Sequence, residues 1–447
     1  MHNRGMANQA PNRSLPGARR FPWSGSAGVA LVLAGCGLSR AQEHIPPPAN
    51  PASSGQIAPS PAAEVPATLS EQANPGEFQV IQGSKAPRGA LDEPFQYDRV
   101  IFRPNVSYRF LYGNGMQSAP GMRNNTIIQD LSPGLLVDLG PDWVLSYTPT
   151  LRYYSGNAFQ DGLDQSVVLR GGVAYEKWRL GLAQSFSESS SPTVETGGQV
   201  DQRAYGTMLS ANYAINAILS LDLGANQSLN FASGAANGAA LQSTEQWSSL
   251  DFLNFKFWQR FTFGVGAGGG YVGSDNSPNQ TFEQFKGRFG WKLTDRVSLQ
   301  ADAGVDDRRF SGAGRSSAVN PVWDGTLQYQ PFDHTSLYVK ISQAITQSVL
   351  QNQVTVNTSY GAGVTQRLLG HFNLNLSGNY GTEDFLATQT VLTSRTDDNY
   401  SFNARLSWPF LRRGSIGLTY QYSYNKSSEA GMTYGTTQMG FDVGYSY

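Results

Sequence analysis

Residues 439–447 read Met439-Gly-Phe-Asp-Val-Gly-Tyr-Ser-Tyr447, with an apolar or aromatic side chain at every second position. Successive side chains of a β-strand point to opposite faces, so a period of two predicts a strand with one apolar face and one polar face. The same alternation occurs in residues 415–425 and 399–408. These three segments therefore predict neighbouring strands that each have an apolar face to cover.

The alternating pattern extends back to about Val100, and no segment shows a sustained helical period. It predicts about eighteen strands, within a range of about 16–18. Short connections such as 140–142 and 176–177 alternate with longer ones rich in Gly, Ser and Asn, such as 189–199 and 383–398. Short turns at one rim and long loops at the other are typical of a transmembrane antiparallel up-and-down β-barrel, an all-β fold.

The composition fits a barrel in lipid. Charged residues make up 15% of the 447 residues and aromatic residues 12%, and there are 49 glycines. A soluble all-β protein would need to bury its apolar faces, whereas here aromatic residues stand near the segment ends as in a membrane girdle. The net charge is −1 and no basic run occurs, so nucleic-acid binding is not expected.

The N-terminal residues predict export. Residues 1–20 contain arginines and no acidic residue, and an apolar stretch follows that is too short to span a bilayer as a helix. Ser39 and Ala41 place small residues before a cut, which predicts a signal peptide over residues 1–41. Alternatively, Leu33-Ala-Gly-Cys36 resembles a lipobox, which would make Cys36 a lipidation site rather than a discarded residue.

A linker is expected between the signal peptide and the barrel. Residues 42–97 are rich in Pro and Ala and poor in large apolar residues, so they predict a disordered periplasmic linker. Within it, residues 76–97 are transitional, and a short periplasmic plug, a short strand or no ordered element are all open outcomes. The barrel is expected over residues 98–447.

Four segments resemble known outer-membrane barrels. Phe441-Asp-Val-Gly-Tyr-Ser-Tyr447 resembles the closing strand that such barrels present to the barrel-assembly machinery, although Phe is commoner than Tyr447 at its end. Three further segments are similar to the putative β-barrel porin family of Gram-negative bacteria: Arg103-Pro-Asn-Val-Ser-Tyr-Arg-Phe110, Leu131-Ser-Pro-Gly-Leu-Leu136 and Tyr400-Ser-Phe-Asn-Ala-Arg-Leu406. The likeness covers about residues 98–447. It implies the cell outer membrane, with lipid and lipopolysaccharide as neighbours, and brings no site residues.

Enzymatic motifs are weak. Residues 264–269 match G-x-G-x-x-G, but no helix is expected after them, so the glycines are interpreted as relief of crowding in a strand. His334 and His371 fall at short turns, and Asp306 and Asp307 are adjacent, so their side chains should point to opposite faces. We expect no enzyme, no cofactor and no metal site.

The polar face of the barrel should line a lumen. Opposed charges on such a wall can bias which solutes pass. The candidate lumen-lining residues are Arg103, Arg109, Asp130, Arg152, Arg170, Asp222, Lys286, Arg288, Asp302, Lys340, Arg405 and Asp442. They favour a porin-like channel for passive diffusion of small polar solutes, with a slight preference for anions; for each charge the alternative is a salt bridge that braces the wall.

The same alternating strands allow a second interpretation of the barrel. It could be a non-conducting structural or export-system component for polysaccharide secretion or surface attachment, and a homo-oligomer is compatible with either role. The loop 383–398 is a candidate constriction. Residues 242–257 break strict alternation, which indicates a bulge.

Overall fold

The computed structural model describes residues 95–97, 99–234, 241–311, 317–387, 394–411 and 413–446. Among them, no helix is both long enough and apolar enough to cross a membrane. The strands are β1 (Phe95–Tyr97), β2 (Val100–Ala119), β3 (Met122–Leu139), β4 (Trp143–Tyr154), β5 (Gly162–Tyr175), β6 (Trp178–Thr193), β7 (Gly198–Ala214), β8 (Leu219–Ser233), β9 (Thr244–Trp258), β10 (Phe261–Ser274), β11 (Gln280–Thr294), β12 (Val297–Phe310), β13 (Ser317–Phe332), β14 (Thr335–Gln347), β15 (Gln353–Leu368), β16 (Phe372–Ala387), β17 (Arg395–Phe410), β18 (Gly414–Ser427) and β19 (Tyr434–Ser446).

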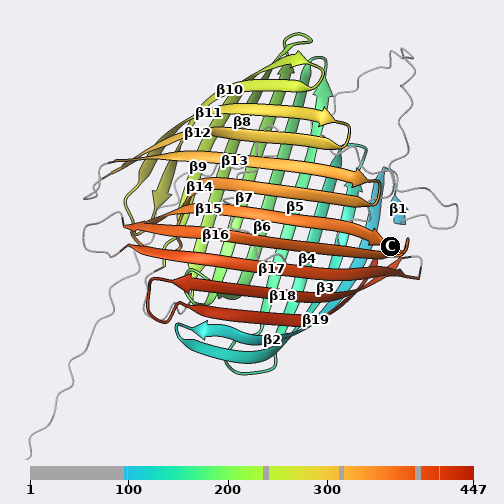
Figure 1. Cartoon of the computed structure of the whole chain (residues 1–447), viewed down its shortest axis with the longest axis vertical. Coiled ribbons are helices and arrows are strands. Elements are labelled where there is room, and N and C mark those ends of the chain that lie inside the picture. Colours follow the sequence, from blue (N-terminus) through green and yellow to red (C-terminus); the bar gives the residue numbers. More distant parts are fainter. Residues whose placement is uncertain are drawn as a thin grey trace, which may run out of the picture. The chain divides into compact units, whose positions relative to one another are not determined.

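The sheet closes on itself. Consecutive strands from β2 to β19 pair antiparallel, and β19 pairs with β2, with Phe441 opposite Phe110. Figure 1 shows the front strands crossing those behind at a steep angle, as tilted strands of a closed barrel must. The prediction of an antiparallel barrel of about eighteen strands is confirmed.

The two rims differ as expected, but the long loops are shorter than predicted. The turns at 140–142 and 176–177 are tight, and Glu176 adopts a left-handed φ of 50°. At the other rim, β6 and β7 extend into the predicted loop 189–199, and β16 and β17 extend into 383–398. The loop prediction was wrong there because Gly, Ser and Asn only weakly oppose a strand when a neighbouring backbone continues the hydrogen-bond ladder.

Aromatic side chains form two bands on the outer face. Near the short-turn rim the rings of Trp178 and Tyr213 lie 4.6 Å apart. Towards the other rim, Tyr380 packs against Tyr360 and Tyr400, with ring centroids 6.2 and 5.0 Å apart. Such paired bands mark the two membrane interfaces of a barrel and bracket its apolar belt.

The N-terminal predictions lie almost entirely outside the described residues. This holds for the signal peptide over residues 1–41, for Cys36 and for residues 42–94 of the linker, all of which stay predictions. The last linker residues form β1, which pairs with the start of β2, with Phe95 opposite Phe102. A short strand was one of the outcomes expected for this transitional segment.

Candidate functional site: the inner wall and the mouth of the barrel

Asp130 on β3 joins two arginines on the inner face of the barrel. Its Oδ2 accepts a hydrogen bond from Arg109 Nε on β2 at 3.0 Å, and its Oδ1 accepts one from Arg152 Nε on β4 at 2.9 Å. Arg152 Nη1 also lies 2.9 Å from Asp164 Oδ2 on β5. The register puts Arg109, Asp130 and Arg152 directly opposite one another, so four neighbouring strands share one charge network.

A second network surrounds Arg288 on β11. Its Nε lies 3.2 Å from Asp302 Oδ1 on β12, and its Nη1 lies 3.4 Å from Asp222 Oδ2 on β8. Its guanidinium also stacks on Phe252, 3.7 Å from the ring centroid. A guanidinium over an aromatic face is attracted by the ring quadrupole, so the stack holds Arg288 between its two carboxylates.

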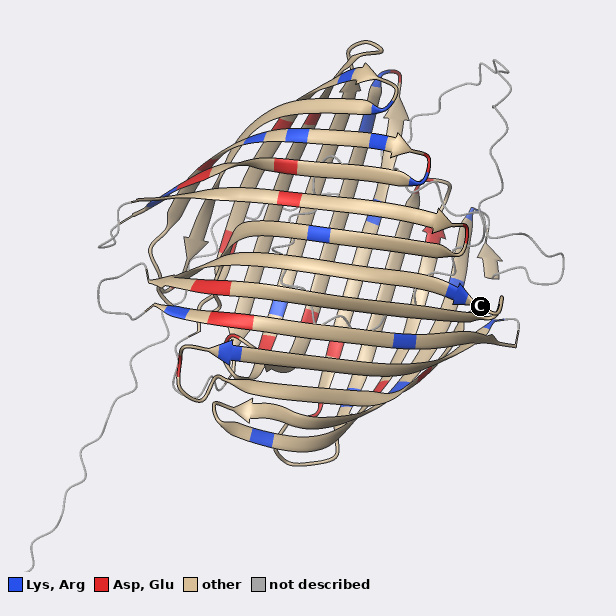
Figure 2. Ribbon diagram, viewed as in Figure 1, with Lys and Arg blue, Asp and Glu red and all other residues tan. Residues whose placement is uncertain are grey.

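The remaining candidates divide into paired and unpaired groups. Arg103 pairs with Asp138 at 2.7 Å, and Arg405 Nη2 with Asp442 Oδ2 at 2.6 Å. For Arg170 and Lys286, the described part of the chain contains no ion pair or side-chain hydrogen bond. Lys340 lies on β14 and belongs to the residues that have an interaction partner. Figure 2 shows charges of both signs along the strands as well as at their ends.

Paired charges of this kind brace a wall. A carboxylate held between two arginines is fixed by charge-assisted hydrogen bonds on neighbouring strands. The bracing interpretation therefore fits Arg109, Asp130, Arg152, Asp222 and Arg288. Sequence reasoning found these residues one by one but could not pair them, because pairing needs the register between strands.

The glycines of β10 make room for inward side chains. A Cβ at Gly266 would lie 2.6 Å from the Phe252 ring, and one at Gly270 would lie 2.5 Å from the Phe282 ring. The G-x-G-x-x-G run thus sits inside a strand and relieves crowding there, as predicted. Sequence reasoning missed the phenylalanines themselves, whose signal is an aromatic residue on an otherwise polar row.

Two further arginine pairs lie buried towards the long-loop rim. Arg308 Nε donates to Asp306 Oδ1 at 2.9 Å, and Arg395 Nε donates to Asp397 Oδ1 at 2.8 Å. Asp307, the sequence neighbour of Asp306, instead pairs with Arg309 at 3.6 Å. The prediction that Asp306 and Asp307 point to opposite faces is confirmed.

One short segment crosses the mouth of the barrel. Residues 194–197 connect β6 to β7, yet Glu195 accepts hydrogen bonds from the Ser348 hydroxyl and, at 2.9 Å, from the Val349 N–H beyond β14. Arg395 Nη1 on β17 donates to the Glu195 carbonyl at 2.9 Å. In the eighteen-strand ring, β14 and β17 lie on the side opposite β6, so this mouth bridge spans the opening.

Burial makes the mouth bridge sensitive to protonation. Removal of the Glu195 carboxyl from water raises its pKa above the ordinary value, and the hydrogen bonds from Ser348 and Val349 oppose this only in part. The predicted constriction at 383–398 stays a prediction. Much of that segment is strand, its residues 388–393 lie outside the described residues, and the segment seen across the mouth is 194–197.

A second loop narrows the same end of the barrel. Phe159, in the connection between β4 and β5, packs on Leu111 and Ile128, which share the inner row of Arg109 and Asp130. The Phe159 ring also lies 5.1 Å from that of Tyr154. Part of this connection therefore turns inward against the wall.

Within the described ranges, no cluster of three or more His, Cys, Asp or Glu side chains could hold a metal ion. The expectation of no cofactor and no enzymatic activity stays a prediction.

Comparison with known proteins points to one family. Residues 283–446 match the model of the family putative beta-barrel porin 2. No curated protein matches the chain.

Solved structures of similar shape include outer-membrane proteins of Pseudomonas aeruginosa. OpdL is 15% identical with a TM-score of 0.41, covering 77% of this chain and 98% of its own. OccK11 (OpdR) is 14% identical with a TM-score of 0.40, covering 80% and 98%, and OccK2 (OpdF) is 12% identical with a TM-score of 0.43, covering 77% and 97%. At these identities and TM-scores the likeness supports no conclusion about function.

The family match covers β12 to β19 and most of β11, which form one continuous part of the closed ring. It confirms the family resemblance predicted from the sequence. Residues 283–446 are thus similar to the putative beta-barrel porin 2 family, and the described residues form an eighteen-strand β-barrel of the outer membrane.

Proposed function

We propose that the barrel is a porin-like channel through which small polar solutes diffuse passively across the outer membrane. The observation that carries the proposal is the closed ring of eighteen strands with a polar, charged inner face. Barrels of 16–18 strands are wide enough to leave an aqueous channel. The twelve charged residues predicted from the sequence would line it.

We propose a slight preference for anions. The ion-paired residues of the wall offset one another, so they add little net charge to the channel. Arg170 on β5 and Arg179 on β6 share the inner face, and neither has an ion pair among the residues that the structure describes. Two uncompensated guanidinium groups near the short-turn rim would attract anions.

The test is conductance in a planar bilayer. Protein shown to be folded by heat-modifiable gel mobility should give stepwise current. In a salt gradient the reversal potential should favour anions, and Arg170→Gln with Arg179→Gln should shift it towards cations. Arg203→Gln is the matched control, because Arg203 pairs with Glu188 on the outer face and should leave the reversal potential unchanged. Reproducible silence from folded protein would contradict the channel and favour the structural or export alternative.

The mouth bridge should restrict the current in a pH-dependent way. Because burial raises the pKa of Glu195, the bridged state binds a proton more tightly than an open state would. The bridge is therefore strongest at acidic pH and weakens as the pH rises through the raised pKa. Current should increase with pH in the unaltered chain. Glu195→Gln cannot ionise, so most of this increase should be lost.

The closing strand suggests a route of assembly. In β19, alternating outward residues such as Phe441 and Val443 face the same way as Phe110 and Tyr108 of β2, the strand with which it closes the ring. We propose that β19 is the strand presented to the barrel-assembly machinery. Replacement of Phe441 by Ser should then reduce the yield of folded protein in the outer membrane more than replacement of the inward Gln438.

A further inference from the structure

A group of polar side chains lies on the outer face of β6–β9. It consists of Gln184 on β6, Thr207 on β7, Gln227 on β8, and Ser249 and Asp251 on β9; we call it the outer polar patch. Gln184 is opposite Thr207, which is opposite Gln227. Thr207 shares its row with Leu209 and Tyr205, whose side chains are 52% and 39% exposed, so this row faces outwards.

The patch lies at the depth of the membrane. On β6, Gln184 stands between the aromatic residues Trp178 and Phe186, and on β7 Thr207 stands between Tyr213 and Tyr205. Members of the two aromatic bands therefore lie on both sides of the patch along each strand, which puts it inside the apolar belt.

The same holds for β9. Ser249 and Asp251 stand between Trp247 and Phe257, both of which are exposed on the outer face. This is where the alternation of residues 242–257 breaks. The predicted bulge is present at the end of β9 next to the short turn to β10, where Phe257 is an extra residue in the pairing of the two strands. The break in alternation places the acidic side chain of Asp251 on the outer face.

Hydrocarbon cannot satisfy these groups. The Thr207 hydroxyl lies 2.8 Å from Gln184 Oε1 and 3.2 Å from Gln227 Oε1. The side-chain NH₂ groups of Gln184 and Gln227 have no hydrogen-bond acceptor among the described residues. Asp251 accepts from Gly224 N at 3.1 Å and from Ser249 Oγ at 3.4 Å, so its charge is only partly compensated. Acyl chains offer no donor or acceptor to any of them.

Small residues lie opposite the two members of the patch on β9. Ala225 lies opposite Ser249, Ala267 lies opposite Asp251, and both alanines are exposed. In membranes, small residues let two backbones approach closely and polar side chains then hydrogen-bond across the contact. The outer polar patch thus has the composition of a protein contact within the bilayer.

We propose that the outer polar patch is the interface with a second copy of this chain. A second copy carries the same patch at the same depth and orientation, so a two-fold axis along the membrane normal brings patch to patch. The patch is self-complementary, because it holds both free amide donors, on Gln184 and Gln227, and a carboxylate acceptor, on Asp251. The interface requires a barrel in lipid but does not require that the barrel conducts.

Cysteine cross-linking in the outer membrane tests the interface. Thr207→Cys in the full chain, treated with a short bismaleimide, should give an adduct of twice the monomer mass. The matched control is Ala362→Cys on β15, also small, outward and exposed, which should give at least about tenfold less adduct. The same treatment of the unaltered chain measures any adduct that forms through Cys36. Equal yields at the two positions, no adduct at Thr207→Cys, or an adduct with a different protein would each overturn the proposal.

A second variant separates association from folding. Gln184→Leu with Gln227→Leu removes both amide donors from the patch, so the barrel should fold with normal heat-modifiable mobility and become monomeric by native mass spectrometry. An unchanged oligomer in this variant, or a monomeric unaltered chain in lipid, would overturn the interface. Conductance that persists in the monomeric variant would leave the channel proposal intact.

Discussion

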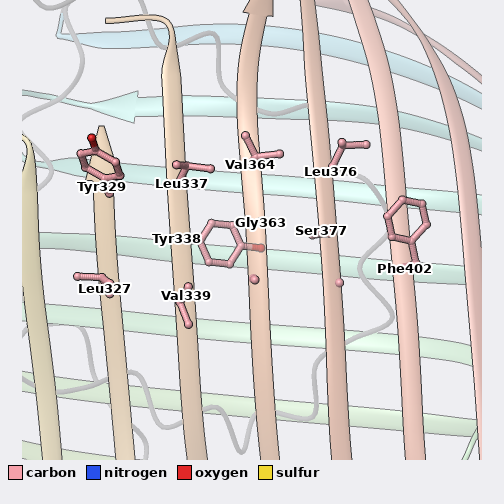
Figure 3. Close-up of a pocket in the computed structure, with 12 residues that line it drawn as sticks. Leu327, Tyr329, Leu337, Tyr338, Val339, Gly363, Val364, Leu376, Ser377 and Phe402 are labelled. Carbon is pink, nitrogen blue, oxygen red and sulfur yellow. The ribbon is translucent and has the colours of Figure 1, made fainter. Parts of the chain in front are cut away.

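Two parts of the outer face meet the membrane in different ways. On β13–β17 the face carries a groove of about 570 Å³ that is lined almost wholly by apolar side chains. Figure 3 shows Leu337, Val364, Leu376 and Phe402 of this groove on four neighbouring strands. On β6–β9 the corresponding belt carries the outer polar patch with Thr207 near its centre.

The difference shows that the outward side chains of a strand indicate what covers that part of the barrel. Both faces have the same strand geometry and the same period of two, so the fold alone does not decide which side chains stand there. A row that lipid covers needs only apolar groups, whereas a row covered by protein can carry donors and acceptors. The apolar groove and the outer polar patch therefore indicate two different neighbours.

The largest difference should come from a charge placed in each region. Leu376→Arg puts a guanidinium into the lipid-covered groove and should lower the free energy of unfolding by about 2–4 kcal/mol. Thr207→Arg should cost clearly less in the monomer, because the side-chain amides of Gln184 and Gln227 lie beside it. Equilibrium urea unfolding in lipid vesicles measures both. Asn375→Asp, on the inner row beside Leu376 and opposite Arg405, should be nearly neutral. Equal losses at Leu376 and Thr207 would remove the distinction between the two faces.

A smaller effect is expected from the charge of the patch itself. Asp251→Asn keeps an acceptor for Gly224 N but removes the carboxylate that would bind the partner's amides. The dissociation constant between copies should rise about three- to tenfold, which equals about 0.6–1.4 kcal/mol. Dilution in detergent followed by native mass spectrometry gives this constant. Asp384→Asn, outward on β16, is the control, and a similar rise there would make the effect non-specific.

The smallest effect should come from filling the groove. Gly378→Val adds an outward strand-forming side chain where a Cβ would meet its nearest neighbour, Ser401 O, at 3.7 Å. It should raise the free energy of unfolding by about 0.5–1 kcal/mol. Gly363→Val is the contrasting variant, because its Cβ would lie 2.4 Å from the Tyr338 ring and should destabilise the barrel. Destabilisation by both would mean that the groove has no free space.

The sequence predicted the fold well because alternation is local. The alternation within one strand is enough to predict its apolar and polar faces, and strands such as β17 and β19 could be predicted without knowledge of their neighbours. The ion pairs could not be predicted from the alternation within single strands. Arg405 on β17 reaches Asp442 on β19 across the intervening β18, where a Cβ at Gly417 would lie 2.5 Å from the Asp442 carboxylate.

The mouth bridge also could not be predicted from the sequence. Glu195 meets Ser348 and Arg395, which are far away in the chain, and only the closed ring brings these segments to one opening. The outer polar patch does leave a signal in the sequence. The break in alternation around Ser249 and Asp251 indicates a bulge, but without the register it does not reveal polar side chains on the lipid side.

The most direct test of a water-filled barrel uses adjacent positions on one strand. Asn375 faces inwards beside Arg405, and Leu376 faces outwards into the apolar groove. A charged, water-soluble thiol reagent added to single channels in a planar bilayer should reduce the current of Asn375→Cys in steps and leave that of Leu376→Cys unchanged. Equal responses at the two positions, or channels that respond only at Leu376→Cys, would contradict a polar face that encloses water.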